Sequence, residues 1–235
     1  MCEMLELRRD PEIFRSEGGW FSARWHFSFD RYRDPANTGF GTLRVFNDDR
    51  LIPGAVWPMH PHRDIEGITY VVEGTFRHED DIGTGGILPA GSVQRMTLGS
   101  GAWHSEQNAS DSEPMRFIQM WILPAEGGLP PSCEQRVLSR DDRVDRLLEV
   151  ISPAGGPGVL VHQDARVFVS AVSAGTSVAR AIPAGFGHYL YLIGGGIELN
   201  GEKLATGDAA KIQAETALDI RALEPSELIT VEVRV

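Results

Sequence analysis

The chain has 235 residues, a formal net charge of −11 and two cysteines. A chain of this length can form one large domain or two small ones around a buried core. The negative charge argues against direct binding to nucleic acid or to an anionic membrane, although it allows a protein partner. Because neither cysteine lies in a CxxC pair, we expect neither a disulfide framework nor a thiolate zinc site.

The first ten residues are charged and contain no apolar signal-type region. No stretch of the sequence combines the length and the apolarity of a transmembrane helix. We therefore expect a cytoplasmic protein without a membrane anchor.

Short strands dominate the pattern of the first half. Residues 20–30 alternate aromatic with small or polar side chains, which predicts a strand with its aromatic residues on one face. Residues 42–46 predict a second strand, and the Asn-Asp-Asp sequence at 47–49 predicts the turn that ends it. Between 65 and 123, β-branched runs alternate with Gly-rich turns. Strands this short and evenly spaced predict an all-β fold, either an antiparallel sandwich or a barrel.

Two pairs of metal-ligand residue types occur in this β region. His60 and His62 are separated by a proline, and His104 and Glu106 by a serine. Residues i and i+2 of a strand point to the same face, so each pair directs two donors the same way. Two such strands facing each other would hold one metal ion with three imidazoles and one carboxylate, which leaves coordination positions open for a reaction. A simpler interpretation of the first pair alone is a proline-stiffened loop with two exposed imidazoles.

This donor set suits iron, manganese, nickel, copper, cobalt or zinc and does not choose among them. Glu66 competes with Glu106 for the carboxylate position, because it too lies an even number of residues from its histidine partner. Distance favours Glu106, since two strand residues span about 6.6 Å and four span about 13 Å. We therefore predict His60, His62, His104 and Glu106 as the ligands, and keep Glu66 as an alternative ligand or a residue that supports them.

Other histidines and Cys133 receive simpler interpretations. His78 is expected at the surface or hydrogen-bonded in the core, and His26 in core packing. Cys133 is a lone thiol in a linker and is given no role. Six large side chains are candidates for the wall of an apolar pocket beside the metal, although aromatic residues at strand spacing more often fill a barrel interior. These six are Trp25, Phe27, Trp57, Trp103, Met120 and Trp121.

A linker and a helix are predicted in the middle of the chain. Residues 124–140 are rich in Pro and Gly at first and then irregular, which is typical of a linker. Ser139 is expected to cap a helix whose first turn contains two aspartates. Val144, Leu147 and Leu148 would form the apolar stripe of that helix.

The second half of the chain repeats the pattern of the first. Residues 70–74 resemble 191–195, and 89–92 resemble 205–208, in the same order along the chain. This predicts an internal duplication of one β-barrel unit. Counted along the repeat, the counterparts of the four ligand candidates are unable to bind a metal, so the second unit would have the fold without the site. The counterparts are Ala181, Pro183, Ile220 and Ala222.

Six segments together resemble the pirin family of bicupins, with specific motifs up to about residue 136 and a looser likeness beyond it. The resemblance implies two tandem, jelly-roll-like cupin barrels, at 1–135 and at 136–235, the second beginning with the linker helix. It implies a metal in the first barrel only, usually iron, bound by the four ligands predicted above. The six segments are 25–30, 44–48, 60–63, 69–74, 89–94 and 101–106.

The overall length resembles that of the short bacterial pirins with quercetin 2,3-dioxygenase activity. The resemblance therefore implies an oxidoreductase that cleaves a flavonol such as quercetin with O2, in which Glu106 would take the proton of the 3-hydroxyl group. One alternative is a different small, enolic substrate. Another is a non-enzymatic, iron-dependent redox regulator that acts through a protein partner. Nothing in the sequence separates regulator from enzyme, because both need the same four ligands.

Overall fold

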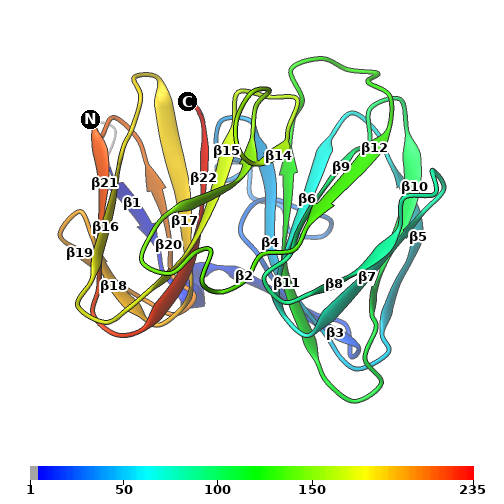
Figure 1. Ribbon diagram of the computed structural model, residues 1–235, viewed down its shortest axis with the longest axis horizontal. Helices are drawn as coiled ribbons and strands as arrows, with labels where there is room; N and C mark the ends of the chain where they lie inside the picture. The colour runs from blue at the N-terminus through cyan, green and yellow to red at the C-terminus, as the bar shows by residue number, and fades with distance from the viewer. Residues whose placement is uncertain (1–4) are drawn as a thin grey trace.

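Strands form almost all of the regular structure, and they build two barrels that lie side by side (Figure 1). The computed structural model describes residues 5–235. Its one helical segment within that range is a short 3-10 helix, η1 (Asp10–Glu12). None of the described residues forms a helix with the length and apolarity needed to cross a membrane. The all-β fold of two tandem barrels predicted from the sequence is confirmed.

The N-terminal barrel consists of β2 (Phe14–Glu17), β3 (Phe21–Trp25), β4 (Leu43–Leu51), β5 (Val56–His62), β6 (Glu66–Glu73), β7 (Thr75–Asp80), β8 (Gly86–Pro89), β9 (Val93–Thr97), β10 (Ala102–Asn108), β11 (Met115–Ile122) and β12 (Ser132–Arg136). A seven-stranded sheet in the order β12-β9-β6-β11-β4-β3-β2 faces a four-stranded sheet in the order β5-β10-β7-β8. Neighbouring strands are antiparallel in both sheets, so short turns join many of them.

The C-terminal barrel consists of β1 (Leu5–Arg8), β13 (Leu148–Ser152), β14 (Val159–Leu160), β15 (Arg166–Val172), β16 (Ser177–Ala181), β17 (Phe186–Gly194), β18 (Gly196–Leu199), β19 (Glu202–Ala205), β20 (Ala209–Ile212), β21 (Ala217–Ala222) and β22 (Ser226–Arg234). Its seven-stranded sheet has the order β1-β20-β17-β22-β15-β13-β14, and its four-stranded sheet the order β16-β21-β18-β19.

The two barrels share one strand order, which confirms the internal duplication. Equivalent hairpins turn on Gly74 and Gly195, both with positive φ, where a Cβ would lie within 2.5 Å of a backbone carbonyl oxygen. Two edge strands depart from the tandem order. β1 pairs with β20 in the place that β12 takes beside β9, and β14 pairs in parallel with β13 in the place where β2 pairs antiparallel with β3. The division of the chain between residues 135 and 136 stays a prediction. The C-terminal barrel also contains β1, from the start of the described chain, as an edge strand.

The helix predicted to begin at Ser139 is not formed, so that prediction is wrong. Ser139 does cap a turn, because its hydroxyl accepts a hydrogen bond from the N–H of Asp142 at 3.2 Å. The chain then leaves the turn at Asp145, whose φ is +54° and whose N–H donates to a carbonyl of β15. Pairing with β15 therefore replaces the helix, and Leu147 and Leu148 pack into two different cores instead of one stripe.

The turn predicted at 47–49 is also wrong, because β4 continues through it to Leu51. Side chains of this strand point alternately to the core between the barrels and to the interior of the N-terminal barrel. Asp48 points to the core between the barrels, whereas Asn47 and Asp49 line a cavity inside the N-terminal barrel.

The aromatic segment at 20–30 forms a shorter strand than predicted, since β3 ends at Trp25. Its aromatic residues do not share one face. Phe27 packs on Tyr189 of the C-terminal barrel, with ring centroids 4.9 Å apart, whereas Phe29 packs edge-on against Trp25 at 5.2 Å. This segment therefore contributes both to the contact between the barrels and to the N-terminal barrel.

The contact between the two seven-stranded sheets forms a continuous apolar core. In Figure 1 the strands β4, β11, β15 and β22 lie where the barrels meet. Because these sheets are buried on both faces, their strands are close to continuously apolar, as in residues 115–122. Fully buried members of this core include Phe46, Ile68, Ile118, Tyr189 and Tyr191.

Asp48 is a buried charge in this core. Its two carboxylate oxygens each accept a hydrogen bond from the guanidinium of Arg116 at 2.8 Å, and Oδ2 also accepts one from the hydroxyl of Tyr191 at 2.6 Å. Burial alone would raise the pKa of Asp48, but the hydrogen bonds and charge of Arg116 hold it below its usual value. Since Tyr191 belongs to the C-terminal barrel, this cluster links the two barrels.

Replacing Asp48 by Asn should lower the free energy of unfolding at pH 7 by about 3–5 kcal/mol, because the buried guanidinium of Arg116 loses its counter-charge. Glu73→Gln is the matched control; its ion pair with Arg50 is exposed, so it should cost less than about 1 kcal/mol. A depressed pKa means that the contribution of Asp48 is present above the unfolded value of about 3.9 and fades as pH falls through both values. Urea unfolding at pH 7 and pH 3 measures this, and equal stability of Asp48→Asn and wild type at pH 7 would contradict it.

Candidate metal centre

The four-stranded sheet of the N-terminal barrel turns one face to the barrel interior, and this face carries the predicted ligands. β5 supplies His60 and His62, and β10 supplies His104 and Glu106, in each case at alternate positions. The two strands are antiparallel neighbours in which His104 lies opposite His60. A bulge after His104 shifts the register, so that Glu106 lies opposite Trp57.

The three imidazoles converge. Each offers a ring nitrogen within 4.8 Å of the other two, and the rings of His60 and His104 are 4.5 Å apart between centroids. Nδ1 of His60 donates a hydrogen bond to the carbonyl of Pro58 at 2.7 Å, so Nε2 is the ring nitrogen that could bind a metal. Nε2 of His104 is buried and finds no hydrogen-bond partner among residues 5–235. A buried, unpaired nitrogen beside two further imidazoles fits a metal ion.

Burial keeps the imidazoles of His62 and His104 neutral. It lowers the pKa of His62 to about 4 and that of His104 to about 2, and the neighbouring imidazoles act in the same direction. At neutral pH both rings therefore carry a lone pair, the form in which histidine binds a metal.

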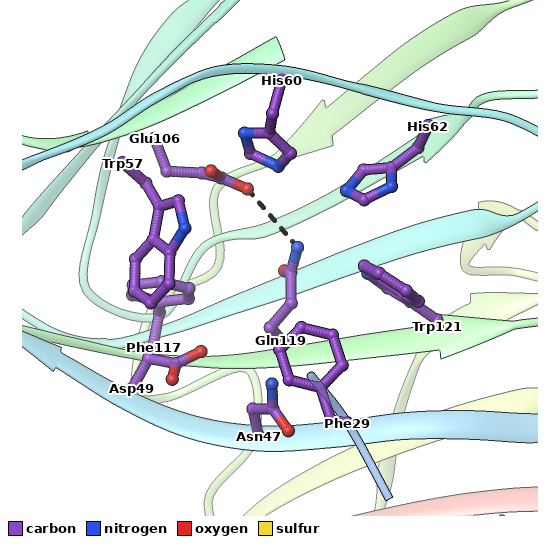
Figure 2. A pocket seen from close by; sticks show the side chains of 10 residues that line it. All are labelled: Phe29, Asn47, Asp49, Trp57, His60, His62, Glu106, Phe117, Gln119 and Trp121. Atoms are coloured by element: carbon purple, nitrogen blue, oxygen red, sulfur yellow. Dashed lines mark hydrogen bonds between the residues drawn. The ribbon is translucent and has the colours of Figure 1, made fainter. Parts of the chain in front are cut away.

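Glu106 adds a carboxylate beside the imidazoles. Its Oε1 lies 3.5 Å from Nδ1 of His104 and accepts a hydrogen bond of 3.5 Å from the side-chain amide of Gln119 (Figure 2). Gln119 is held from its other end by the hydroxyl of Thr69, which donates to it at 2.7 Å. Burial raises the pKa of Glu106 to about 8, and a cation beside the group would lower it again. Glu106 is thus placed both to bind a metal and to exchange a proton.

A cavity lies beside these residues, between the two sheets of the barrel (Figure 2). The space in and above it amounts to about 510 Å³, part of it open to solvent. Its walls are mostly aromatic. Besides His60, His62 and Glu106, the lining residues are Phe29, Asn47, Asp49, Trp57, Phe117, Gln119 and Trp121.

Two polar residues of β4, Asn47 and Asp49, lie across the cavity from the histidines (Figure 2). One side-chain oxygen of each is buried and has no partner within the described part of the chain. Burial raises the pKa of Asp49 well above its usual value, and the charges of Asp48 and Glu106 act in the same direction. Burial thus favours the protonated carboxyl of Asp49, the form that can donate a hydrogen bond to a ligand oxygen.

Glu66, the rival carboxylate, is not brought together with the three imidazoles. The chain bends at Asp64, whose φ is +52°, and Glu66 then begins β6 in the seven-stranded sheet. There it is fully buried and accepts hydrogen bonds from the hydroxyl of Thr97 and from Nδ1 of His162, each at 3.0 Å. Since His162 belongs to the second half of the chain, Glu66 contributes to the contact between the barrels.

The sequence predicted the cavity wall only in part. Trp57 and Trp121 line the cavity as expected, whereas the other four candidates lie outside it. Those four are Trp25, Phe27, Trp103 and Met120. Phe117 and Gln119 were missed, although they share strand parity with Trp121, because both faces of β11 are buried and the pattern looked uniformly apolar.

In the C-terminal barrel, the positions equivalent to His104 and Glu106 carry apolar residues, and Arg180 takes the place of His60. Strand pairing identifies the counterparts on β21 directly. Glu106 pairs with the fourth residue of β7, and the fourth residue of β18, the equivalent strand, pairs with Ile220. These counterparts lie two residues earlier on β21 than the ones found by counting along the sequence. Ile220 is therefore the counterpart of Glu106, and Leu218 that of His104. Both pack into the apolar core of their barrel.

Two cupin-like barrels, one with a histidine-rich centre, define the chain as a bicupin. Comparison with family models identifies both halves: the Pirin model matches residues 8–122, and the model of the quercetinase C-terminal cupin domain matches residues 149–233. These matches span most of the sequence, and the chain belongs to the pirin family.

Individual relatives agree over nearly the whole chain. A quercetin 2,3-dioxygenase of Escherichia coli strain K12 is 39% identical over 228 residues, covering 96% of this chain and 97% of the relative. A pirin-like protein of Caulobacter vibrioides is 36% identical over 231 residues, covering 97% and 99%. The crystal structure of the bacterial pirin YhhW from Escherichia coli in complex with nickel(II) superposes with a TM-score of 0.92 at 36% identity, covering 98% and 99%.

The two rival carboxylates should respond differently to amide substitution. Glu106→Gln should weaken binding of nickel(II) more than about 10-fold, because changes even to residues that only support ligands cost about 10–100-fold. Glu66→Gln should leave nickel(II) affinity within about twofold and instead lower the melting temperature, since Glu66 is buried between the barrels. Isothermal titration and thermal unfolding measure the two effects. The opposite pattern of affinities would show that the carboxylate has been misassigned.

Proposed function

We propose that this protein is a metal-dependent dioxygenase that cleaves a flavonol such as quercetin with O2. His60, His62, His104 and Glu106 hold the metal. The observation that carries the proposal is the convergence of three imidazoles beside a carboxyl group at an aromatic-walled cavity. A relative named quercetin 2,3-dioxygenase supports the substrate class, and the nickel(II) complex of the Escherichia coli pirin supports the metal.

The donor set of three nitrogens and one carboxylate oxygen suits iron as the metal, and equally manganese, cobalt, nickel, copper or zinc. When bound, the ion supplies Lewis-acid polarisation of the substrate oxygen and a template for the reaction with dioxygen. The protein contributes the remaining features, which are the shape of the cavity, the placement of a proton acceptor and the exclusion of water.

The aromatic walls select a flat ligand. Trp57 and Phe117 border the cavity on one side and Trp121 on the other, with the ring of Trp121 4.6 Å from that of His62 (Figure 2). Planar aromatic substrates pack favourably against such rings, and the apolar surroundings strengthen the electrostatic interactions at the centre by excluding water. A flavonol, which is planar and aromatic, fits these walls.

Glu106 is the proton acceptor of the proposed reaction. Its carboxylate faces the cavity, and Gln119 and Thr69 fix its orientation through consecutive hydrogen bonds. Burial raises the pKa of Glu106 and a bound cation lowers it again, so with the metal in place the group is a carboxylate that can accept a proton. Glu106 would remove the proton of the enolic hydroxyl group as the substrate binds.

Asn47 and Asp49 provide polar contacts at the other end of the cavity. Each has a buried oxygen without a partner in the described part of the chain, and burial raises the pKa of Asp49, which favours the form of its carboxyl that can also donate a hydrogen bond. A ligand with hydroxyl groups at the end remote from the metal would satisfy these atoms. This favours a polyhydroxylated substrate over a purely apolar one.

Activity should depend on the cavity and on the metal together. With iron(II) added, wild-type protein should consume O2 and bleach quercetin, whereas His62→Ala and Glu106→Gln should each lose at least about 100-fold in kcat/KM, in line with the usual contribution of a general base. Glu113→Gln, which makes the same chemical change at an exposed loop residue, should keep wild-type activity. Chelation should abolish turnover, and iron(II) should restore it.

Two results would overturn this proposal. One is wild-type activity in metal-free protein. The other is bound metal without turnover of quercetin or any other enolic aromatic compound, which would leave the regulator hypothesis as the better one.

A further inference from the structure

Three further donor residues meet inside the N-terminal barrel, on the other side of β10 from β5. His78 and Asp80 alternate on β7 and lie opposite Glu106 and His104 in the strand ladder, so they point to the same interior face. Cys133 comes from β12, the edge strand of the facing sheet. One potential ligand atom of each of the three lies within 4.8 Å of the other two.

The surroundings of the His78 side chain indicate that a ligand binds at this place. Its side chain is fully buried, yet neither of its ring nitrogens has a hydrogen-bond partner among residues 5–235. The nearest carboxylate atom, Oδ2 of Asp80, lies 3.6 Å from Nδ1, which is longer than a hydrogen bond. Buried polar atoms are almost always paired, so an imidazole with two unpaired nitrogens calls for a partner that takes its lone pair.

Asp80 and Cys133 are suited to the same partner. The backbone N–H groups of Ile82 and Thr84 donate to Oδ1 of Asp80 at 3.1 and 2.9 Å, and the hydroxyl of Thr84 donates to Oδ2 at 2.6 Å. These bonds fix the carboxylate where it faces the other two residues. Burial raises the pKa of the Cys133 thiol to about 11, which excludes a reactive, exposed nucleophile but not a metal ligand.

The fold does not need these residues, as the duplicated barrel shows. Leu199 takes the place of His78 as the fourth residue of its hairpin strand. Leu5 takes the place of Cys133, because Cys133 pairs with the fourth residue of β9 and Leu5 pairs with the fourth residue of β20, the equivalent strand. Leu199 and Leu5 pack into the apolar core of the C-terminal barrel. The N-terminal barrel thus has an imidazole and a thiol at positions where the C-terminal barrel has two leucines.

We infer that His78, Asp80 and Cys133 form a second metal site, separate from the three-histidine centre, for a divalent ion of the zinc type. An imidazole nitrogen, a carboxylate oxygen and a thiolate sulfur are donors that zinc and cobalt(II) bind in tetrahedral geometry. Donor atoms around such an ion stand about 3.3–3.8 Å apart, which this cluster reaches with small side-chain rotations. The fourth position would be taken by water.

A sequence without a CxxC pair gave no reason to expect such a site. The barrel assembles it from β7 and β12, which belong to facing sheets. An ion bound there would tie these strands together, and the proton of the thiol would be released to solvent as the thiolate forms. The ring of His78 lies 5.6 Å from that of His104, so the site would adjoin the first centre.

Cobalt(II) titration of the full chain carrying Cys2→Ser, in which Cys133 is the single thiol, tests the inference. We expect two equivalents bound per chain and a near-ultraviolet thiolate-to-cobalt absorption band that saturates with one of them. Cys133→Ser and His78→Leu should each remove this band and one equivalent. His62→Ala should keep the band, because it affects only the first centre. Unchanged unfolding of the metal-free Cys133→Ser variant shows that the fold is intact.

A single equivalent that is insensitive to Cys133→Ser, or two equivalents without a thiolate band, would overturn the inference. So would a band that survives His78→Leu at full affinity, because the thiol would then bind cobalt adventitiously. Zinc provides a second measurement: one equivalent should protect Cys133 from a thiol reagent in the Cys2→Ser chain, and unchanged labelling would also count against the site.

Discussion

The face-to-face packing of the two seven-stranded sheets is the contact on which the rest of the molecule depends. It buries one side of β4 and β11 against the second barrel and leaves the other side of the same strands to shape the cavity. Because side chains alternate along a strand, one segment serves both purposes. In β4, Asp48 bonds to Arg116 in the core between the barrels, while Asn47 and Asp49 line the cavity.

The candidate centre is divided between two sheets with different tasks. The four-stranded sheet carries the three histidines and Glu106, and the seven-stranded sheet carries most of the cavity wall. Their relative position decides whether a ligand can touch the metal and the wall together, so the second barrel acts on the site by supporting the wall from behind. Tyr191 shows this support directly, since it reaches across the contact to Asp48. A barrel without ligands of its own at the equivalent positions can therefore still be required for the site.

The sequence predicted what is local and missed what depends on distant partners. Alternate ligands on a strand are a local pattern, and the histidines were predicted because of it. Asn and Asp favour turns through local hydrogen bonds, whereas the distant partners Arg116 and Tyr191 stabilise Asp48 within a strand. Ser139 does cap a turn, as its sequence context predicted, but pairing with β15 forms in place of the predicted helix. His78 and Cys133 lie on strands of facing sheets, and their spacing in the sequence gives no sign that the barrel brings them together.

Anomalous diffraction from crystals soaked in iron(II), recorded at the iron absorption edge, tests the central claim most directly. The account predicts a peak on the interior face of the four-stranded sheet, with a ring nitrogen of each of His60, His62 and His104 and a carboxylate oxygen of Glu106 within about 2.0–2.2 Å. A peak held by other residues, or no peak there while the three imidazoles turn away from one another, would contradict it.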